Sequence, residues 1–305
     1  MKKILLFLAL ILLVSGLIFF DVQKSNNTSV IKNQPIPNVT LPKNMSNQGY
    51  SHIAIIVMEN RSFPQIVDNP NAPYINSLIK QGILLSNYTA VTHPSLPNYI
   101  ALIGGSTFGI TSDCQNCFVQ ANNFLDQLEA HGKTWKAYME SMPSSCFLGS
   151  TNLYAQKHDP FVYFNDIREN KNRCKNVVAL TSLNSDLSSA SAPNFIWITP
   201  NICNDMHDCS TQTGDKWLSK EVPVILNSKA FKNGNSLLVI TWDEAENSNS
   251  NRVPTIILGN GVKKGLSSNS IYNHYSLLHT FENLWGISPI TEAVKNSAII
   301  KEIML

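Results

Sequence analysis

The segment that decides the fold reads ILLSNYTAVTHPSLPNYIALIGG, from Ile83 to Gly105. Residues 83–90 are apolar with a bias toward β-branched and aromatic side chains, which predicts a buried strand. Residues 100–103 precede two glycines, which predicts the end of a short helix. Ser95 therefore lies near the N-terminus of that helix, where free backbone N–H groups attract anions and favour an alkoxide. Two interpretations follow for Ser95: a helix cap or a displayed nucleophile.

The same alternation of apolar, β-branched runs with helix-like segments continues along the chain. It is typical of an α/β fold in which a mostly parallel central sheet carries helices on both faces. We find no internal repeat and no second linker, so the sequence predicts a single domain over residues 51–305. The expected strands are 52–58, 83–90, 133–139, 194–199, 236–242 and 253–258, and the expected helices include 75–82, 123–132 and 275–285.

The N-terminus is interpreted as an export signal or a membrane anchor. Lys2 and Lys3 precede a charge-free apolar stretch from Ile4 to Phe20, and no clean signal-peptidase site follows. Residues 1–20 therefore favour an uncleaved anchor, with the two lysines on the inner side. Residues 21–50 are rich in Asn, Ser, Pro and Lys and predict a flexible spacer. With or without cleavage, the protein is expected outside the cytoplasm, either tethered to the membrane or secreted.

Composition and charge narrow the function classes. A hydrophobic content of 43% in 305 residues is enough for a sizeable core. The chain has 23 basic against 21 acidic residues and no long basic run, so no nucleic-acid binding is expected. Nothing in the sequence indicates a protein partner.

Six cysteines lie after the apolar N-terminal stretch. An even number outside the cytoplasm predicts disulfides, although Cys114 and Cys117 taken alone also fit half of a redox or metal motif. Nearness along the chain favours three pairs, which are Cys114–Cys117, Cys146–Cys174 and Cys203–Cys209.

Polar side chains follow four of the predicted strands. In a parallel α/β sheet the ligand lies beyond the carboxyl ends of the strands, so these side chains are expected at one edge of the sheet. The four groups are Glu59-Asn60, the segment from Thr92 to Asn98, the segment from Pro200 to Asp208, and Asp243-Glu244.

The acidic residues at these strand ends predict a divalent metal ion. Glu59, Asp243 and Glu244 each follow an apolar strand, where an uncompensated carboxylate is unfavourable. With Asn60 as a neutral oxygen donor, the set suits calcium, magnesium or manganese better than a thiolate or multi-histidine zinc site. Taken singly, Glu59 and Glu244 also fit solvated side chains at strand ends. A cation beside Ser95 lowers the pKa of its hydroxyl and makes it a nucleophile toward phosphorus.

Further polar residues of these segments are candidates for handling a phosphate ester. His207 is the candidate general acid for the leaving group, because it lies among polar residues after a strand. Asn98 follows Ser95 by one helical turn, where its amide either donates to a phosphoryl oxygen or lies on the helix surface. The candidates for substrate binding are Asn98, His93, His158 and Asp205, with a structural role as the alternative for His93.

Five short motifs together resemble a known family. They are VMENRSF at residues 57–63, THPSLPNY at 92–99, PN at 200–201 with NDMHD at 204–208, TWDE at 241–244 and HYSLL at 274–278. In this order they resemble the phosphoesterase family of bacterial acid phosphatases and phosphatidylcholine-type phospholipases C, within the alkaline phosphatase superfamily. The resemblance covers essentially all of residues 51–290.

The resemblance implies an alkaline-phosphatase-like fold that holds one divalent metal ion, with calcium, magnesium, manganese and zinc all open. The spelling SLPN resembles the TFPN nucleophile segment of nucleotide pyrophosphatases, which supports Ser95 over Thr92 as the nucleophile. No counterpart of the histidine-rich second zinc site of alkaline phosphatases is evident, so a single metal is expected. The ligands that the resemblance implies are Glu59, Asn60, Asp243, Glu244 and Ser95.

The function expected from these observations is an extracytoplasmic, metal-dependent acid phosphatase that hydrolyses small phosphomonoesters through a phosphoserine. The THPSLPNY motif and the short chain favour this activity over that of the phospholipases C. One alternative is a phosphodiesterase of the phospholipase C type, which an uncleaved anchor would hold near lipid. The other is a non-catalytic surface binding protein on the same fold, which the presence of Ser95 and Asp243 disfavours.

Overall fold

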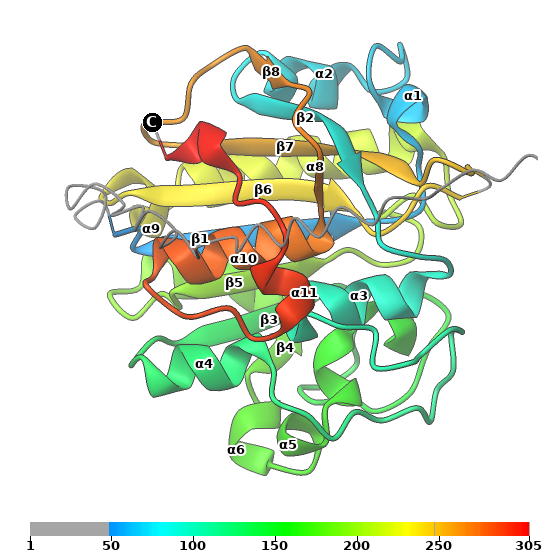
Figure 1. Ribbon diagram of the computed structural model, residues 1–305, viewed down its shortest axis with the longest axis vertical. Helices are drawn as coiled ribbons and strands as arrows, with labels where there is room; N and C mark the ends of the chain where they lie inside the picture. The colour runs from blue at the N-terminus through cyan, green and yellow to red at the C-terminus, as the bar shows by residue number, and fades with distance from the viewer. Residues whose placement is uncertain (1–48, 247, 305) are drawn as a thin grey trace, which may run out of the picture. The chain divides into compact units, whose positions relative to one another are not determined.

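The computed structural model describes residues 49–246 and 248–304, and these residues form an α/β structure around one sheet (Figure 1). The sheet has nine strands in the order β4-β3-β5-β1-β6-β7-β2-β8, with β9 paired to β2. The strands are β1 (His52–Met58), β2 (Ile83–Thr89), β3 (Trp135–Met139), β4 (Val177–Ala179), β5 (Phe195–Thr199), β6 (Ser236–Trp242), β7 (Arg252–Gly259), β8 (Leu266–Ser268) and β9 (Tyr272–Asn273).

The direction of the strands decides where the polar strand ends lie. β1 pairs in parallel with both β5 and β6. β7 runs antiparallel to β6 and also to β2, so β2 points the same way as β6. The carboxyl ends of β1, β2, β5 and β6 therefore meet at one edge. The sequence prediction of a mostly parallel central sheet is confirmed, with β7 as an antiparallel strand that the sequence did not reveal.

Two groups of helices cover the sheet (Figure 1). α3 packs against α10 and α4 in one group, and α8 packs against α2, α7 and α9 in the other. Every residue of β5 and β6 is buried, as expected for strands covered on both faces. The longer helices are α2 (Pro73–Ile79), α3 (Ser95–Gly104), α4 (Phe124–Ala130), α8 (Thr211–Leu226) and α10 (His274–Leu284).

Short helices fill the connections between these elements. The α-helical turns are α1 (Phe63–Ile66), α5 (Asn165–Arg168), α6 (Lys171–Cys174), α7 (Leu183–Ser188), α9 (Lys229–Lys232) and α11 (Glu292–Lys295). The 3-10 turns are η1 (Gln156–His158), η2 (Pro160–Tyr163), η3 (Leu180–Ser182) and η4 (Lys301–Ile303).

The six cysteines form disulfides in the pairs that nearness along the chain favours: Cys114–Cys117, Cys146–Cys174 and Cys203–Cys209. The predicted anchor at residues 1–20 and the predicted spacer up to residue 48 lie outside the described residues. Within the described ranges, we find no helix with both the length and the apolar character needed to cross a bilayer.

Glu282 on α10 is a buried acid away from the polar strand ends. Its Oε1 accepts a hydrogen bond from Ile290 N at 2.9 Å, while its Oε2 is buried with no partner among the described residues. Burial raises the pKa of Glu282 from 4.5 to about 7, against the opposing effect of its hydrogen bonds. Between these two values the folded state holds the extra proton, so the contribution of Glu282 to stability falls as pH rises through this window.

We therefore expect Glu282→Gln to raise the melting temperature at pH 8 but to leave it nearly unchanged near pH 4.5, where wild-type Glu282 is protonated in the native state. Thermal melts of both proteins at the two pH values measure this. The matched control is Glu292→Gln, because the Glu292 side chain is 76% exposed. A shift in melting temperature of equal size at both pH values would contradict the assignment.

Candidate active site

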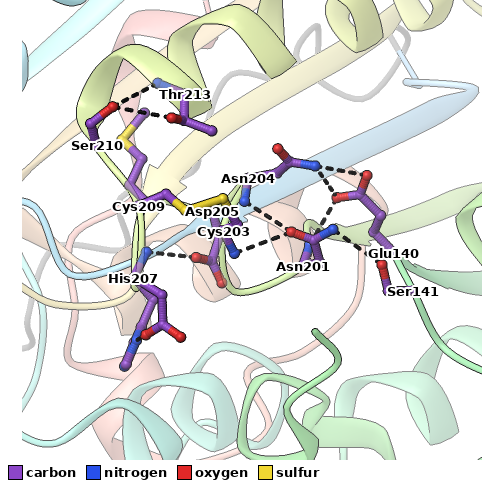
Figure 2. Close-up of a disulfide and its surroundings, with 12 residues drawn as sticks. Glu140, Ser141, Asn201, Cys203, Asn204, Asp205, His207, Cys209, Ser210 and Thr213 are labelled. Atoms are coloured by element: carbon purple, nitrogen blue, oxygen red, sulfur yellow. Dashed lines mark hydrogen bonds and ion pairs between the residues drawn. A yellow bond between two sulfur atoms is a disulfide. The ribbon is translucent and has the colours of Figure 1, made fainter. Parts of the chain in front are cut away.

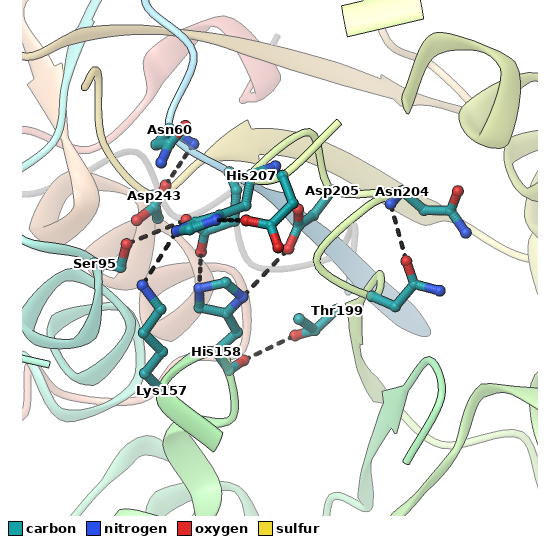
Figure 3. A network of polar contacts seen from close by, with 12 residues as sticks. Asn60, Ser95, Lys157, His158, Thr199, Asn204, Asp205, His207 and Asp243 are labelled. Atoms are coloured by element: carbon teal, nitrogen blue, oxygen red, sulfur yellow. Dashed lines mark hydrogen bonds and ion pairs between the residues drawn. The ribbon is translucent and has the colours of Figure 1, made fainter. Parts of the chain in front are cut away.

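The predicted polar strand ends converge at the carboxyl edge of β1, β2, β5 and β6 (Figure 3). Glu59 follows β1 directly and Asp243 follows β6 directly, and both are 0% exposed. The two strand ends are also joined by their backbones, because Asp243 N donates to Met58 O at 3.0 Å. The first residue of α3 is Ser95, which is 2% exposed.

Ser95 faces the carboxylates rather than capping its helix. Its Oγ lies 3.1 Å from Glu59 Oε2 and 3.3 Å from Glu244 Oε1, so the two carboxylates share its single hydrogen. The N-cap position belongs to Pro94, which has no polar side chain, and the Ser95 hydroxyl makes no capping hydrogen bond to α3. Of the two interpretations for Ser95, the structure therefore matches a hydroxyl displayed at the N-terminus of a helix.

Asn98 differs from the sequence prediction of a substrate-binding amide. Its Nδ2 donates to the carbonyls of Thr92 and Pro94 at 2.9 and 3.0 Å. Its Oδ1 accepts from the N–H groups of Val91 and Thr92 at 3.0 and 3.1 Å. Both amide hydrogens are used, so none remains for a phosphoryl oxygen. Asn98 instead fixes the loop that presents Ser95.

The predicted metal ligands form a buried cluster of oxygen atoms. Asp243 Oδ1 accepts from Asn60 N at 3.1 Å. Asp243 Oδ2 and Asn60 Oδ1 are buried and have no hydrogen-bond partner among the described residues. Burial, followed by the negative charges of Glu59 and Glu244, raises the pKa of Asp243 well above its ordinary value. Unpaired oxygens and crowded carboxylates fit a hard divalent cation.

His158 joins two acids of this site rather than facing an open space. Its Nε2 lies 3.0 Å from Glu59 Oε1 and its Nδ1 lies 3.2 Å from Asp205 Oδ2. Burial alone would lower the pKa of His158, but the charges and hydrogen bonds of Glu59 and Asp205 raise it above its ordinary value. The ring of Tyr99 stacks on it, with centroids 5.3 Å apart. His158 and Asp205 thus hold Glu59 in place.

His207 lies beside His158, in the loop after β5. Asp205 Oδ1 accepts from His207 N at 2.7 Å, so Asp205 holds both histidines. His207 Nδ1 lies 2.6 Å from Asp208 Oδ1, and its Nε2 lies 3.2 Å from Lys157 Nζ. A lysine ammonium only donates, so Nε2 accepts and Nδ1 carries the hydrogen that Asp208 accepts. Figure 3 shows these side chains around Ser95 and Asp243.

The loop that carries His207 is braced by a disulfide and by amide contacts (Figure 2). Cys203 bonds to Cys209 across the loop. Asn201 Oδ1 accepts from the N–H groups of Cys203 and Asn204 at 3.1 and 3.0 Å. Glu140, at the end of β3, accepts from Asn204 Nδ2 at 2.9 Å. These contacts brace the loop after β5 in the conformation that places Asp205 and His207 beside Glu59 and His158.

One grouping was not expected from the sequence. Glu59, His158 and His207 each bring one potential ligand atom to within 4.8 Å of the others, a spacing that suits a metal ion. The sequence predicts a single metal on carboxylate and amide oxygens and no histidine-rich group. The ammonium of Lys157 at His207 Nε2 opposes a second cation at this position, because both charges are positive.

Two further histidines contact the acidic pair after β6: His93 contacts Glu244, and His274 contacts the backbone of Asp243. The half-exposed His93 contacts Glu244 Oε2 through its Nδ1. His274 is buried, and its Nε2 donates to the carbonyl of Asp243 at 2.6 Å while its Nδ1 faces Tyr88 Oη at 3.0 Å. Burial lowers the pKa of His274 to about 4, so it stays neutral.

The sequence analysis assigned no role to four residues that shape this site, although Tyr99 and His274 lie in the THPSLPNY and HYSLL motifs. Lys157 adjoins His158 in the chain, and Tyr99 follows Ser95 by one helical turn, so spacing was an available signal for both. Asp113 is remote in sequence and offered none. The four residues are Tyr99, Asp113, Lys157 and His274.

The sequence matches the Phosphoesterase family over residues 67–288. It is 36% identical over 261 residues to a phosphatidylinositol-3-phosphatase of Mycobacterium tuberculosis, covering 83% of each chain. It is 32% identical over 257 residues to an acid phosphatase of Aspergillus fumigatus, covering 80% of this chain but 57% of that protein. These relatives are hydrolases of phosphoric esters.

A comparison of folds agrees. The structure resembles a Vibrio parahaemolyticus protein of the alkaline phosphatase superfamily with a TM-score of 0.56 at 12% identity, over 80% of this chain and 68% of that one. At this identity the likeness concerns the fold alone. The family match over residues 67–288 and the mycobacterial relative show that this chain belongs to the phosphoesterase family, as a hydrolase acting on phosphoric ester bonds.

Proposed function

We propose that this protein is an extracytoplasmic, metal-dependent phosphatase that hydrolyses phosphomonoesters through a phosphoserine at Ser95. The observation that carries the proposal is the position of the Ser95 hydroxyl. It lies at the start of α3, in contact with Glu59 and Glu244 and beside the unpaired oxygens of Asn60 and Asp243. This arrangement suits nucleophilic attack on phosphorus, and phosphatase relatives support the same class of substrate.

In the first step the Ser95 Oγ–P bond forms as the bond from phosphorus to the leaving oxygen breaks. The serine proton passes to Glu244 Oε1, whose partner oxygen contacts the half-exposed His93 and so connects to solvent. The leaving oxygen takes a proton from His207, which holds it at Nε2 when protonated.

In the second step a water oxygen attacks phosphorus and gives its proton to His207 Nε2. The bond from phosphorus to Ser95 Oγ breaks, and the serine regains its proton through Glu244. The sum of both steps is an ester and water converted to an alcohol and phosphate, with His207 returned to its starting state.

A divalent cation held by Glu59, Asn60, Asp243, Glu244 and Ser95 supplies a Lewis acid beside the hydroxyl. Contacts within the protein hold two of these ligands in place before a cation binds. Glu59 is fixed by His158, and Asp243 is fixed by Asn60 N and by the His274 contact to its carbonyl. Four carboxylate or amide side chains and a hydroxyl offer the oxygen ligands that magnesium, manganese and calcium prefer.

The location outside the cytoplasm is supported by the three disulfides, which persist in oxidising compartments. The apolar stretch from Ile4 to Phe20 agrees with export, as an anchor or a cleaved signal. A membrane tether would bring a lipid phosphate within reach, and the mycobacterial relative is named for such a substrate.

The test is a substrate panel on the full-length protein, stripped with a chelator and restored with single divalent ions. We expect the stripped protein to be inactive and restored protein to cleave p-nitrophenyl phosphate far faster than bis-p-nitrophenyl phosphate or phosphatidylcholine. Full activity after stripping would contradict the metal dependence. A preference for the diester or for phosphatidylcholine would favour the phospholipase C activity, and no turnover with any ion would favour a binding protein.

A further inference from the structure

Lys157 places an ammonium group inside the candidate active site. It lies in η1, directly before His158, and its side chain is 24% exposed. Its Nζ lies 2.9 Å from Asp113 Oδ2 and 3.2 Å from His207 Nε2 (Figure 3). The lysine therefore connects the candidate general acid to a carboxylate outside the predicted metal ligands.

Asp113 ties this ammonium to the helix of the nucleophile. Its Oδ1 accepts from Leu96 N at 3.0 Å, and Leu96 is the residue after Ser95. Its other oxygen holds Lys157, so a single carboxylate joins the first turn of α3 to the lysine. Asp113 also precedes Cys114, which is bonded to Cys117 and restrains this loop. The distance between Lys157 and Ser95 is thereby fixed by three short links.

The charges of the site leave a role for this lysine. The four carboxylates Glu59, Asp205, Asp243 and Glu244 carry more negative charge than one divalent cation and a protonated His158 neutralise, and a phosphomonoester dianion adds two more negative charges. Among the residues that the structure describes, Lys157 is the only lysine or arginine whose side chain contacts a side chain of this site. The nearby Arg61 is committed to the backbone carbonyls of Met206 and Cys209.

The contact between Lys157 and His207 also suits an incoming anion. While Lys157 donates to His207 Nε2, that nitrogen cannot hold the proton that a leaving group requires. An anionic oxygen that accepts the hydrogen bond of the Lys157 ammonium would leave His207 Nε2 free to hold a proton. The same anion would offset the positive charges of Lys157 and of the protonated His207. A phosphoryl oxygen has both the charge and the acceptor geometry for this position.

We propose that Lys157 binds a non-bridging phosphoryl oxygen of the substrate and makes the site prefer a monoester dianion to a diester monoanion. This inference rests on the proposed phosphatase function. A diester carries one negative charge fewer and an alkyl or aryl group on one of the oxygens that a monoester leaves free. The lysine therefore stabilises the monoester selectively, while the metal ligands and Ser95 act on both esters.

The test compares two substrates with one leaving group, p-nitrophenyl phosphate and methyl p-nitrophenyl phosphate. We expect Lys157→Met in the full-length protein to lower kcat/KM for the monoester by about 100-fold and to affect the diester much less. Lys157→Arg keeps the charge and should recover much of the monoester preference. Calorimetric titration with inorganic phosphate should show binding weakened by about tenfold or more in Lys157→Met.

The chain offers a matched control. Lys136 pairs with Asp186 at 2.8 Å and its side chain is 29% exposed, close to the values for Lys157, but it lies on β3 outside the site. Lys136→Met should leave the substrate preference and phosphate affinity unchanged. The inference is overturned if Lys157→Met lowers both activities equally or binds phosphate as tightly as wild type. If wild type shows no Ser95-dependent turnover, the proposed function fails, and phosphate binding alone still decides the role of Lys157.

Discussion

Ser95→Ala is expected to lower kcat/KM for a chromogenic phosphomonoester by at least about 10⁴-fold. In the proposed mechanism this hydroxyl forms the bond to phosphorus, so its removal leaves binding and charge stabilisation without a nucleophile. The side chain is small and borders the polar cluster, so the fold should survive. Steady-state kinetics gives the loss, and circular dichroism with a thermal melt shows that the protein is folded.

Thr92→Ala is the matched control, because Thr92 lies in the same motif and, in the described part of the chain, the hydrogen bond of its Oγ1 goes to the carbonyl of His93. Activity should change by no more than about threefold, the usual effect of a surface substitution. Near-normal turnover by Ser95→Ala, or loss of turnover in Thr92→Ala with Ser95 intact, would assign the nucleophile elsewhere.

Asp243→Asn is expected to lower turnover by roughly 10³-fold, since loss of a metal ligand forfeits several kcal/mol of transition-state stabilisation. The same substitution should raise the melting temperature of the metal-free protein. It removes a buried carboxylate whose Oδ2 is unpaired and which is crowded by Glu59 and Glu244. Divalent ions should stabilise wild type by mass action and the variant much less.

A buried aspartate with satisfied oxygens gives the contrast. Asp215 accepts from the N–H groups of Tyr74 and Ile75 at 3.2 and 2.8 Å, so Asp215→Asn should lower the melting temperature and leave the metal response intact. Asp243 is not a metal ligand if Asp243→Asn instead lowers the melting temperature of the metal-free protein. The same conclusion follows if divalent ions raise the melting temperature of the variant as much as that of wild type.

The parts of the site that follow strands were predictable from the sequence. Glu59 and Asp243 stand directly after apolar runs, and the carboxyl ends of parallel strands meet at one edge, so their convergence follows from the strand pattern. The family resemblance added the choice of Ser95 over Thr92. The roles of these residues remain predictions, while the α/β fold and the family are confirmed.

Contacts between loops were not predictable. Asn98 has the spacing of a substrate ligand, yet four backbone groups occupy its amide, and only the folded path of the loop reveals this. Asp113 accepts hydrogen bonds from Leu96 N and from Lys157 Nζ, but it lies in a loop whose sequence has no helical or strand periodicity. α8 was missed because Gly214 and Pro223 interrupt its helical pattern, and packing against α2 and α7 outweighs their low propensity.

The central claim is that a phosphoryl group is transferred to Ser95. Acid quenching of the metal-restored protein during turnover of a phosphomonoester, followed by mass spectrometry of the peptide that spans residues 92–99, tests it most directly. The account predicts phosphate on Ser95, absent in Ser95→Ala and absent without substrate. An active protein that never carries phosphate on this peptide, or that carries it on Thr92, would contradict the account.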